Sequence, residues 1–339
     1  MDVCVCGAQV PFMRGGAELH TENLVDALRD AGHRAELVRL PTAWDRVRVF
    51  ESALAWRLVP VDGDLVIATN FPSYFVRHPR KVVWLFHQHR AAYDGAGGPW
   101  SDFGLDDDGL EAQRLLTEWD NRALEESERI YTTSGVVAER LAWYNGIAGE
   151  PLAHPPPLHD RLLDLPLAAT QPYVFSALRL EGNKRPELIV DALAHARDAR
   201  AVVAGSGTMA DDLRARARAQ SVDDRLDLLG FVPDDDLVRR FAECRAVIYA
   251  PYNEDYGYVT LQAFAAGKPV ITAADSGGVL EWVEDDVTGI VTDGSAAELG
   301  AAAQRLIADP ALAAQLGRAG RERVADLSWK PVVEKLVGP

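Results

Sequence analysis

The feature that most constrains the fold is the alternation of short apolar runs with amphipathic stretches along nearly the whole chain. In the first half, apolar runs predict strands at 2–6, 35–40, 64–68, 82–86 and 129–133. Amphipathic patterns predict a helix over about 17–31, which ends at Gly32, and another over about 110–126, between the last two strands. In the second half, strands are predicted at 173–177, 201–204, 226–229, 246–249, 269–272 and 289–291. Strands that alternate with helices indicate right-handed crossovers and doubly wound parallel sheets, so the predicted fold class is α/β.

A cluster of prolines divides the two halves. Residues 153–167 contain Pro155, Pro156, Pro157 and Pro166, which disfavour both helix and strand ladder, so we expect the interdomain connection there. A chain of 339 residues fits two domains at about 150 residues each. We expect an N-terminal domain at 1–160 and a C-terminal domain at 161–327, with a last helix within about 328–339 that packs back on the first domain.

Composition restricts the classes of ligand. The formal net charge of −16 repels a nucleic-acid backbone, and no basic stripe offsets it, so we expect no nucleic acid and only small phosphate ligands. Cys4, Cys6 and Cys244 are expected to be buried thiols of a reducing compartment. The N-terminus lacks the pattern of a signal peptide and no apolar run is long enough to span a bilayer. We therefore expect a cytoplasmic protein with at most peripheral membrane contact.

Ligands of doubly wound sheets bind beyond the carboxyl ends of the strands, so the loops there are the candidate sites. Gly15 and Gly16 lie between the first strand and the first helix, where bare glycine and helix N–H groups favour an anion, although a tight turn without a ligand would use the same glycines. Arg179 and Lys184 follow the strand at 173–177, and the two cations would converge on one pyrophosphate unless they are solvated surface charges.

The most informative segment runs from Asn253 to Ile271. It follows the strand that ends near Ala250 and enters a helix whose first N–H groups, around Tyr258 to Thr260, face a phosphate or sugar oxygens, with a plain helix cap as the alternative. Glu254 lies in the loop, where its carboxylate would accept hydrogen bonds from sugar hydroxyls.

Together these segments resemble the retaining glycosyltransferases of family 4, and the resemblance covers nearly the whole chain. It is carried by Gly15-Gly16-Ala17-Glu18, the Arg179 and Lys184 pair, Ala204-Gly205-Ser206-Gly207, Leu229-Gly230-Phe231-Val232, the Glu254 segment and Ser276-Gly277-Gly278. The resemblance implies the GT-B fold, two Rossmann-like doubly wound domains facing a central cleft. The first domain would bind the acceptor and the second the nucleotide-sugar donor.

The resemblance also implies roles for single residues. Gly16 would touch the donor diphosphate, Arg179 and Lys184 would neutralise it and stabilise the departing nucleoside diphosphate, and Glu254 would hold hydroxyls of the transferred sugar. The nucleotide base would lie near Gly205 and Phe231. The sugar and phosphate would meet the backbone of Gly257, Tyr258, Val259 and Thr260.

Gln262 stands where the family usually carries a second glutamate, which binds the ribose diol. An amide still hydrogen-bonds a hydroxyl but lacks the charge that strengthens the bond, so we hypothesise that a deoxyribose donor such as a dTDP-sugar is tolerated. The sequence does not decide among UDP, GDP and dTDP as the donor nucleotide. The acceptor would be a hydroxyl-bearing small molecule, a lipid-linked molecule or a glycan.

Two histidines, His87 and His89, follow the strand at 82–86. The family commonly carries a histidine there near the sugar and acceptor, and the frame of the strand favours His87; a metal-binding pair is disfavoured because no further ligand accompanies it. The implied reaction retains the anomeric configuration by front-face attack and needs no metal or other cofactor. The acidic run 106–108 is expected to be a solvated loop leading into the next helix.

Other readings remain. An epimerase or hydrolase of the same general fold would share the phosphate site but would need an acid/base set that the sequence does not display. A non-catalytic nucleotide-sugar-binding protein is a further alternative, with Gln262 as its only hint. A dinucleotide-dependent oxidoreductase is disfavoured because the first loop lacks Gly-x-Gly-x-x-Gly.

Overall fold

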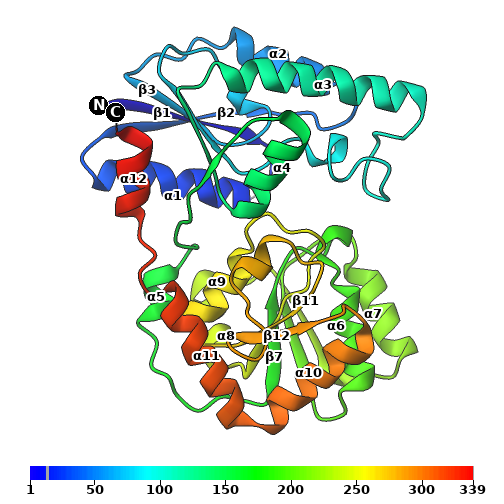
Figure 1. Ribbon diagram of the computed structural model, residues 1–339. Coiled ribbons are helices and arrows are strands. Elements are labelled where there is room, and N and C mark those ends of the chain that lie inside the picture. Colours follow the sequence, from blue (N-terminus) through cyan, green and yellow to red (C-terminus); the bar gives the residue numbers. More distant parts are fainter. Residues whose placement is uncertain (13–14, 339) are drawn as a thin grey trace. The chain divides into compact units, whose positions relative to one another are not determined.

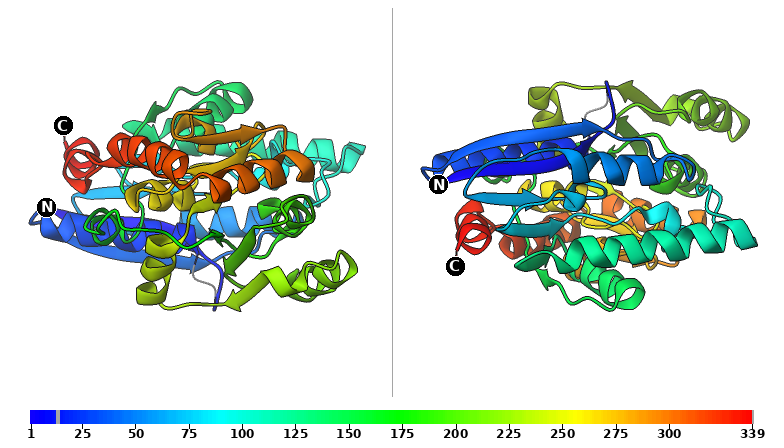
Figure 2. Two further views of the ribbon diagram at one scale, coloured as in Figure 1. Left: turned by 90° about the horizontal axis from the view of Figure 1, so that it is seen from below. Right: turned by 90° about the horizontal axis from the view of Figure 1, so that it is seen from above.

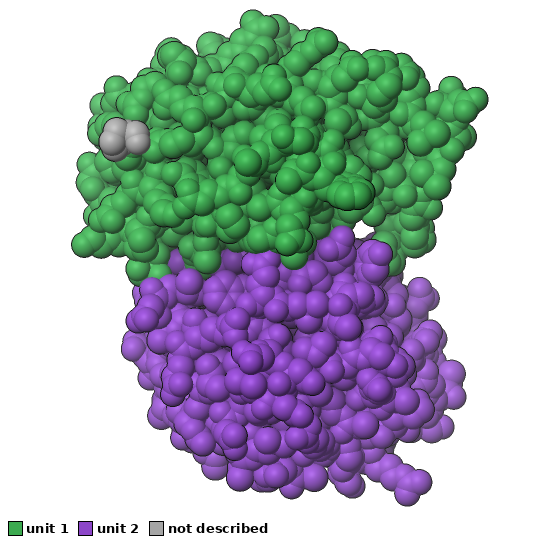
Figure 3. Space-filling view, in the orientation of Figure 1, with its two compact units in different colours: residues 1–154, 328–339 green, residues 155–327 purple. Residues whose placement is uncertain are grey.

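The computed structural model describes residues 1–12 and 15–338 and divides the chain into two compact units (Figure 3). Unit 1 comprises Met1–His154 and Ser328–Pro339, and unit 2 comprises Pro155–Leu327. The division therefore lies a few residues before the predicted one at 160. The reason is helix α5 (His159–Leu163), which packs against helices α8 and α9 of unit 2.

Unit 1 is built on a six-stranded parallel sheet in the order β2-β1-β3-β4-β5-β6. Five of its strands fall where the apolar runs predict them: β1 (Asp2–Gln9), β2 (Arg34–Pro41), β3 (Leu65–Ala68), β4 (Lys81–Leu85) and β5 (Arg129–Thr132). The sixth, β6 (Glu150–Pro151), was not predicted, because an exposed two-residue edge strand carries no apolar run.

Helices cover both faces of this sheet. Successive strand residues point to opposite faces, so Cys6 packs in the core on the side of α2 (Val49–Leu58) and α3 (Asp107–Glu125), while Val5 packs with α1 (Gly16–Asp30) and α12 (Trp329–Val337). Figure 1 shows α2 and α3 above the sheet and α1 and α12 below it, and α3 is the long green helix at the edge of the right-hand view of Figure 2. Helix α4 (Gly135–Asn145) packs beside β5 and β6. The last helix, α12, thus belongs to unit 1, where it packs against α1.

Unit 2 contains a second six-stranded parallel sheet, in the order β12-β11-β10-β7-β8-β9. Its strands are β7 (Tyr173–Ala177), β8 (Arg200–Ala204), β9 (Leu226–Gly230), β10 (Ala246–Ile248), β11 (Val270–Ala273) and β12 (Gly289–Thr292). The centre of this sheet is β7 and β10, and the loops that follow these two strands carry Arg179, Lys184 and Glu254. Two parallel sheets flanked by helices confirm the predicted α/β class.

The helices of unit 2 form two groups. Helix α10 (Ala296–Ala308) packs against α6 (Glu187–His195), which packs against α7 (Ala210–Ala219). The second group, on the left in Figure 1, joins α5, α8 (Asp234–Glu243), α9 (Tyr258–Ala265) and α11 (Pro310–Val324). Each crossover thus returns over one face or the other, as a doubly wound sheet requires.

The proline-rich segment is not wholly irregular. Helix α5 lies within the segment predicted to lack helix, because the prolines at 157 and 166 leave a proline-free stretch between them that is long enough for a turn of helix. Leu162 of α5 is fully buried in the core of unit 2, which anchors the connection to that unit.

Candidate functional site

The centre of the candidate site is Glu254, in the loop between β10 and α9. Its side chain forms an ion pair with Lys184 and accepts a hydrogen bond of 2.7 Å from the Tyr249 hydroxyl at Oε2. Glu254 is buried and Lys184 half-buried. The carboxylate predicted to bind sugar hydroxyls and one of the cations predicted to bind the diphosphate are therefore in direct contact.

The electrostatics of this group keep Glu254 ionised. Burial raises the pKa of Glu254, but the charge of Lys184 and the hydrogen bonds from Lys184 and Tyr249 outweigh it, so the pKa lies below its usual range. Burial and the charge of Glu254 raise the pKa of Tyr249 far above its usual value, and the charge of Arg179 opposes this. Glu254 is thus an acceptor, Tyr249 is a donor, and Arg179 acts on the same group.

Arg179 differs from Lys184 in having no protein partner. It is exposed just beyond β7 and makes no hydrogen bond or ion pair with any residue of 1–12 and 15–338. A guanidinium presents five N–H donors in a planar fork that matches phosphate oxygens. Arg179 is therefore free to meet an anionic ligand.

The Glu254 loop is shaped by the segment Ser276–Gly278. The Glu254 amide donates to the Ser276 carbonyl at 3.1 Å, and the Gly278 amide donates to the Glu254 carbonyl at 2.7 Å. Gly277 has φ +62°, and a Cβ there would lie 2.6 Å from the Glu254 carbonyl oxygen. The two glycines are required because the backbones lie in contact.

Arg185, which the sequence analysis assigned no role, fixes the start of the same loop. Its Nε donates to the Ala250 carbonyl at 2.8 Å and its Nη2 to the Pro251 carbonyl at 2.9 Å, while the guanidinium pairs with Asp275 at 2.6 Å. Tyr249 was missed as well. The signal for Arg185 was weak, because its partners lie 65 to 90 residues away in the chain. Tyr249 lies only five residues before its partner Glu254, but a single tyrosine at the end of a buried strand reads as core.

The start of α9 offers fewer amides than expected. Gly257 adopts φ +83° as the N-cap, and the Thr260 amide donates to the Gly257 carbonyl at 2.9 Å. Thr260 is fully buried and Val259 is 9% exposed, whereas Tyr258 is half-buried. The Thr260 N–H is used by the first turn of the helix itself, which leaves the N–H groups of the preceding residues as the more open ones.

The residues predicted near the nucleotide base lie together. Gly205 has φ +133°, and a Cβ there would lie 1.9 Å from the Leu178 carbonyl oxygen, so its loop rests on the residue before Arg179. The Gly205 amide donates to the Gly230 carbonyl at 2.8 Å. Phe231 follows Gly230 and is 84% exposed, which leaves its ring open to stack on a planar group.

Gln262 is bound to the interdomain connection. It is 7% exposed, and its Nε2 donates to the Pro157 carbonyl at 3.0 Å. A glutamate at this position would turn a carboxylate oxygen toward that carbonyl. The amide therefore suits this contact with the connection, a contact that the sequence does not predict.

In unit 1, only one of the two candidate histidines is accessible. His87 is half-buried beyond the end of β4, with its Nδ1 2.7 Å from the Gln88 carbonyl. His89 is 4% exposed and stacks on Trp44 with ring centroids 5.7 Å apart and Phe103 nearby; burial lowers its pKa to about 4. The geometry favours His87 over His89 as a group that a substrate could contact.

The first glycine loop is partly described, because Arg14 lies outside the described residues. The Gly15 amide donates to Glu18 Oε2 at 2.8 Å, which caps α1. Gly16 begins the helix and is exposed. Of the two glycines predicted to meet a diphosphate, Gly15 already has an amide partner, and Gly16 is the one open to a ligand.

The described residues hold neither a metal-ligand cluster nor a membrane-spanning helix. In residues 1–12 and 15–338, no three His, Cys, Asp or Glu side chains gather as a metal site would require. Asp106 caps α3 by accepting from the Gly109 amide at 2.9 Å, and Asp107 and Asp108 lie in the first turn of the helix. The acidic run, which was predicted to be a loop leading into this helix, is therefore the start of the helix itself. Within the same described residues, no helix has the length and apolar character needed to cross a bilayer.

Comparison with known proteins assigns a family to part of the chain. Residues 164–323 match the family described as Glycosyl transferases group 1. A D-inositol 3-phosphate glycosyltransferase of Corynebacterium diphtheriae is 32% identical over 169 residues, which are 47% of this chain and 39% of that protein. The chain therefore aligns with less than half the length of this curated relative.

Two solved structures are similar over nearly the whole chain. Sucrose-phosphate synthase from Thermosynechococcus elongatus has a TM-score of 0.75 at 20% identity and covers 98% of this chain and 96% of its own. Anabaena Alr3699/HepE in complex with UDP-glucose has a TM-score of 0.71 at 18% identity, with 99% and 98% covered. These similarities agree with a GT-B fold of two Rossmann-like units.

Proposed function

Because residues 164–323 form a glycosyltransferase domain of the group 1 family, we propose that this chain transfers a sugar from a nucleoside-diphosphate sugar to a hydroxyl acceptor. We further propose that it does so with retention of the anomeric configuration and without a metal. The observation that carries the proposal is the exposed, unpartnered Arg179 beside the Lys184–Glu254 pair in unit 2.

In this proposal the two cations act on the leaving group. Arg179 and Lys184 bind the diphosphate and offset the negative charge that grows on it as the bond to the sugar breaks. Glu254 holds hydroxyls of the transferred sugar, and the ion pair with Lys184 keeps its carboxylate in place before the donor binds. The start of α9 adds backbone contacts, and Phe231 and Gly205 flank the base.

The proposed chemistry needs no separate strong base. The acceptor oxygen attacks the anomeric carbon on the face that the diphosphate leaves, the carbon–phosphate oxygen bond breaks with its electrons going to the diphosphate, and the acceptor proton passes to the same phosphate oxygen. The accessible His87 would lie near the transferred sugar and acceptor. This is the reaction that the family resemblance implies.

The donor base is proposed from two sources. The similarity to a protein solved with UDP-glucose makes UDP-glucose the first donor to test. Gln262 lacks the carboxylate that binds a ribose diol, so a dTDP-sugar is the second, and GDP-sugars complete the set. We propose that the protein works in the cytoplasm, where such donors are made available. The acceptor would be a small molecule, a lipid-linked molecule or a glycan.

The decisive experiment measures nucleoside diphosphate release from a panel of UDP-, dTDP- and GDP-sugars with and without hydroxyl acceptors. We expect release that depends on an acceptor, that persists in excess chelator and that is lost in Arg179→Ala. Arg197→Ala is the matched control, because Arg197 is another exposed arginine of unit 2. Release without acceptor would indicate a hydrolase, an isomerised donor sugar an epimerase, and donor binding without turnover a binding protein.

A further inference from the structure

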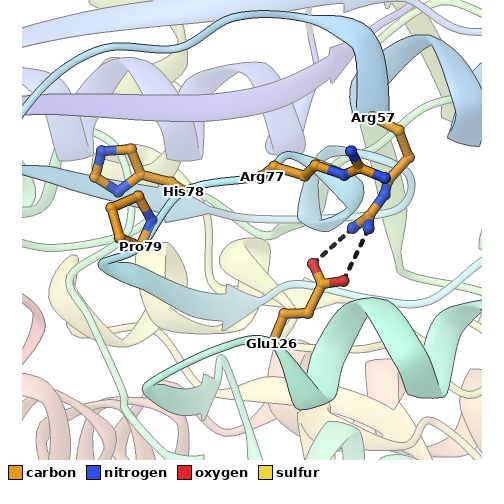
Figure 4. A pocket seen from close by; sticks show the side chains of 5 residues that line it. All are labelled: Arg57, Arg77, His78, Pro79 and Glu126. Carbon is orange, nitrogen blue, oxygen red and sulfur yellow. Dashed lines mark hydrogen bonds and ion pairs between the residues drawn. The ribbon is translucent and has the colours of Figure 1, made fainter.

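A cationic pocket lies in unit 1. It is an open surface pocket of about 380 Å³, lined by Arg57, Arg77, His78, Pro79 and Glu126 (Figure 4). It lies beside the amino end of β4, whereas His87 follows the carboxyl end of that strand. Residues 77–81 read Arg-His-Pro-Arg-Lys, a basic run in a chain of net charge −16. The proposed transfer reaction assigns these residues no role.

The one carboxylate of this pocket is already neutralised. Glu126 accepts from Arg57 at both oxygens, at 2.6 and 2.8 Å, and lies 3.5 Å from the ammonium of Lys81. The hydrogen bonds from Arg57 and the charge of Lys81 hold the pKa of Glu126 below its usual range although burial opposes them. Glu126 thus stays ionised, and two cations share its charge.

Lys81 is held beneath the pocket. Its side chain is fully buried, and its ammonium donates to the carbonyls of Tyr74, Val76 and Ala123 at 2.9, 3.3 and 2.7 Å. Ala123 lies in the last turn of α3, so Lys81 satisfies the end of that helix, where a cation is favoured. Its charge adds to the potential of the pocket although the ammonium cannot reach a ligand.

Arg77 is the cation without a counterpart. It is exposed and makes no hydrogen bond or ion pair within the described parts of the chain. Figure 4 shows its side chain extending toward the guanidinium of Arg57. Two like charges on one side of a cavity repel each other, and an anion placed between them would relieve that repulsion.

We propose that this pocket binds a compact oxyanion of the phosphate class, either inorganic phosphate or the phosphate of a monoester. Arg77 supplies the main fork of N–H donors, Arg57 a second cation, and His78 and Pro79 the wall. Arginine forks match the spacing of phosphate oxygens, and a cavity of this size holds a small ligand. The acidic surface elsewhere repels larger polyanions, so the charge of the patch acts at short range.

The wall is preorganised for such a ligand. His78 is fixed by its own hydrogen bonds: the Arg80 amide donates to its Nδ1 at 3.1 Å, and its Nε2 donates to the Gly63 carbonyl at 3.2 Å. Arg57 is fixed by Glu126 and also lies 3.3 Å from the Phe75 carbonyl. Only Arg77 has to be ordered when the anion binds, which limits the entropy lost.

The test is a titration of the full chain with inorganic phosphate, followed by ³¹P NMR in a background of Arg179→Ala and Lys184→Ala, which removes the proposed donor site. Arg77→Ala should weaken phosphate binding by about tenfold or more, the loss expected for a hydrogen-bonded charge pair. Arg77→Lys keeps the charge but lacks the planar fork of N–H donors, so its affinity for phosphate should lie between those of the parent and Arg77→Ala. Arg218→Ala, an exposed arginine of α7, is the control and should bind as the parent does.

A second arm distinguishes a soluble ligand from a lipid phosphate. The chain is sedimented with vesicles of phosphatidylcholine alone and with phosphatidic acid added. Arg77-dependent sedimentation with phosphatidic acid assigns the pocket to a lipid headgroup, and Arg77-dependent binding of free phosphate alone assigns it to a soluble phosphate. Binding that is absent, or equal in Arg77→Ala and the parent in both arms, overturns the proposal. Arg77 has no hydrogen-bond or ion-pair partner in the part of the chain that the structure describes, so we expect the variant to fold with an unchanged unfolding temperature.

Discussion

At the scale of single residues, the Lys184–Glu254 pair joins stability to the proposed chemistry. Lys184→Ala should lower transfer by roughly a hundredfold or more, because one stabilising contact to the leaving phosphate is lost. The same change leaves a buried carboxylate without its cation and should lower the free energy of unfolding by about 2 kcal/mol. Product formation and chemical denaturation measure the two effects.

A double variant separates them. In Lys184→Ala with Glu254→Gln, the neutral amide no longer needs a cation, so the free energy of unfolding should recover while transfer stays low. Normal transfer by Lys184→Ala would refute the assignment of Lys184 to the leaving group, whatever its effect on stability.

Gln262 carries a second prediction. Gln262→Glu replaces the amide that donates to the Pro157 carbonyl by a carboxylate that cannot donate, so we expect a loss of about 1 to 3 kcal/mol in the free energy of unfolding. Gln171→Glu, at an exposed position of unit 2, is the control and should cost little. Equal unfolding curves for the Gln262→Glu variant and the parent would show that the contact with the connection is unimportant. Turnover of one sugar linked to UDP and to dTDP tests the separate donor hypothesis, which strict UDP dependence would end.

The same residues show what the sequence could predict of the site. Arg179, Lys184 and Glu254 could be singled out because they lie in the loops that follow two predicted strands, and parallel sheets bring such loops together. Arg185 could not be distinguished from a surface charge, because its acceptors at Ala250, Pro251 and Asp275 are far away in the chain. The partner of Gln262 was unpredictable for the same reason.

At the scale of elements, strands were easier to predict than helices. A strand buried on both faces of a parallel sheet is a continuous apolar run, so β7 begins and ends where the sequence placed it. Helices α2, α4 and α5 had no such signal: α2 and α4 lack a strong separation of apolar and polar faces, and α5 is short and flanked by prolines. Their positions are fixed by packing that a single sequence does not display.

Helix α12 allows an element-scale prediction. Leu336 is fully buried in the core that α12 shares with α1 and the sheet of unit 1. Leu336→Ala should cost about 2 to 5 kcal/mol, the range for a buried leucine whose cavity cannot collapse. In Leu336→Ala, amide hydrogen exchange should be faster in unit 1. The control Lys330→Ala, at an exposed position of the same helix, should exchange as the parent does. An unchanged unfolding midpoint for Leu336→Ala would contradict the role of α12 in unit 1.

At the scale of the whole molecule, pH acts through buried groups at the place where the chain leaves and re-enters unit 1. His154 is the last residue of the first passage through that unit, and its ring lies 5.6 Å from that of Trp329, just after the chain returns. His20 of α1 is 3.2 Å from His154, measured between ring nitrogens, and 4.4 Å from Trp84, measured between ring centroids. The cluster ties both passages of the chain to the sheet of unit 1.

The pKa values of this cluster set the direction of the effect. Burial lowers the pKa of His20 to about 3, and burial followed by the proximity of His20 lowers that of His154 well below its usual value. The unfolded chain takes up these protons near pH 6.5 and the folded chain does not, so stability from the neutral rings is present above pH 6.5 and is lost as the pH falls toward 3. Asp120 acts in the opposite sense, because burial raises its pKa to about 7. The unfolded chain loses this proton near pH 4 and the folded chain keeps it until about pH 7, so the contribution of Asp120 to the free energy of unfolding is lost as the pH rises from about 4 to 7.

We therefore expect the free energy of unfolding to decrease as the pH is lowered from 6.5. In His20→Phe this decrease should be less steep by about 1.4 kcal/mol per pH unit, the effect of one proton. Asp120→Asn provides the opposite control, since its gain over the parent should grow between pH 4 and 7. Urea denaturation at pH 7.5, 6 and 5 measures both slopes. Parallel curves for His20→Phe and the parent across this range would mean that His20 is protonated in the folded chain as readily as in the unfolded one, which its burial between Trp84 and His154 argues against.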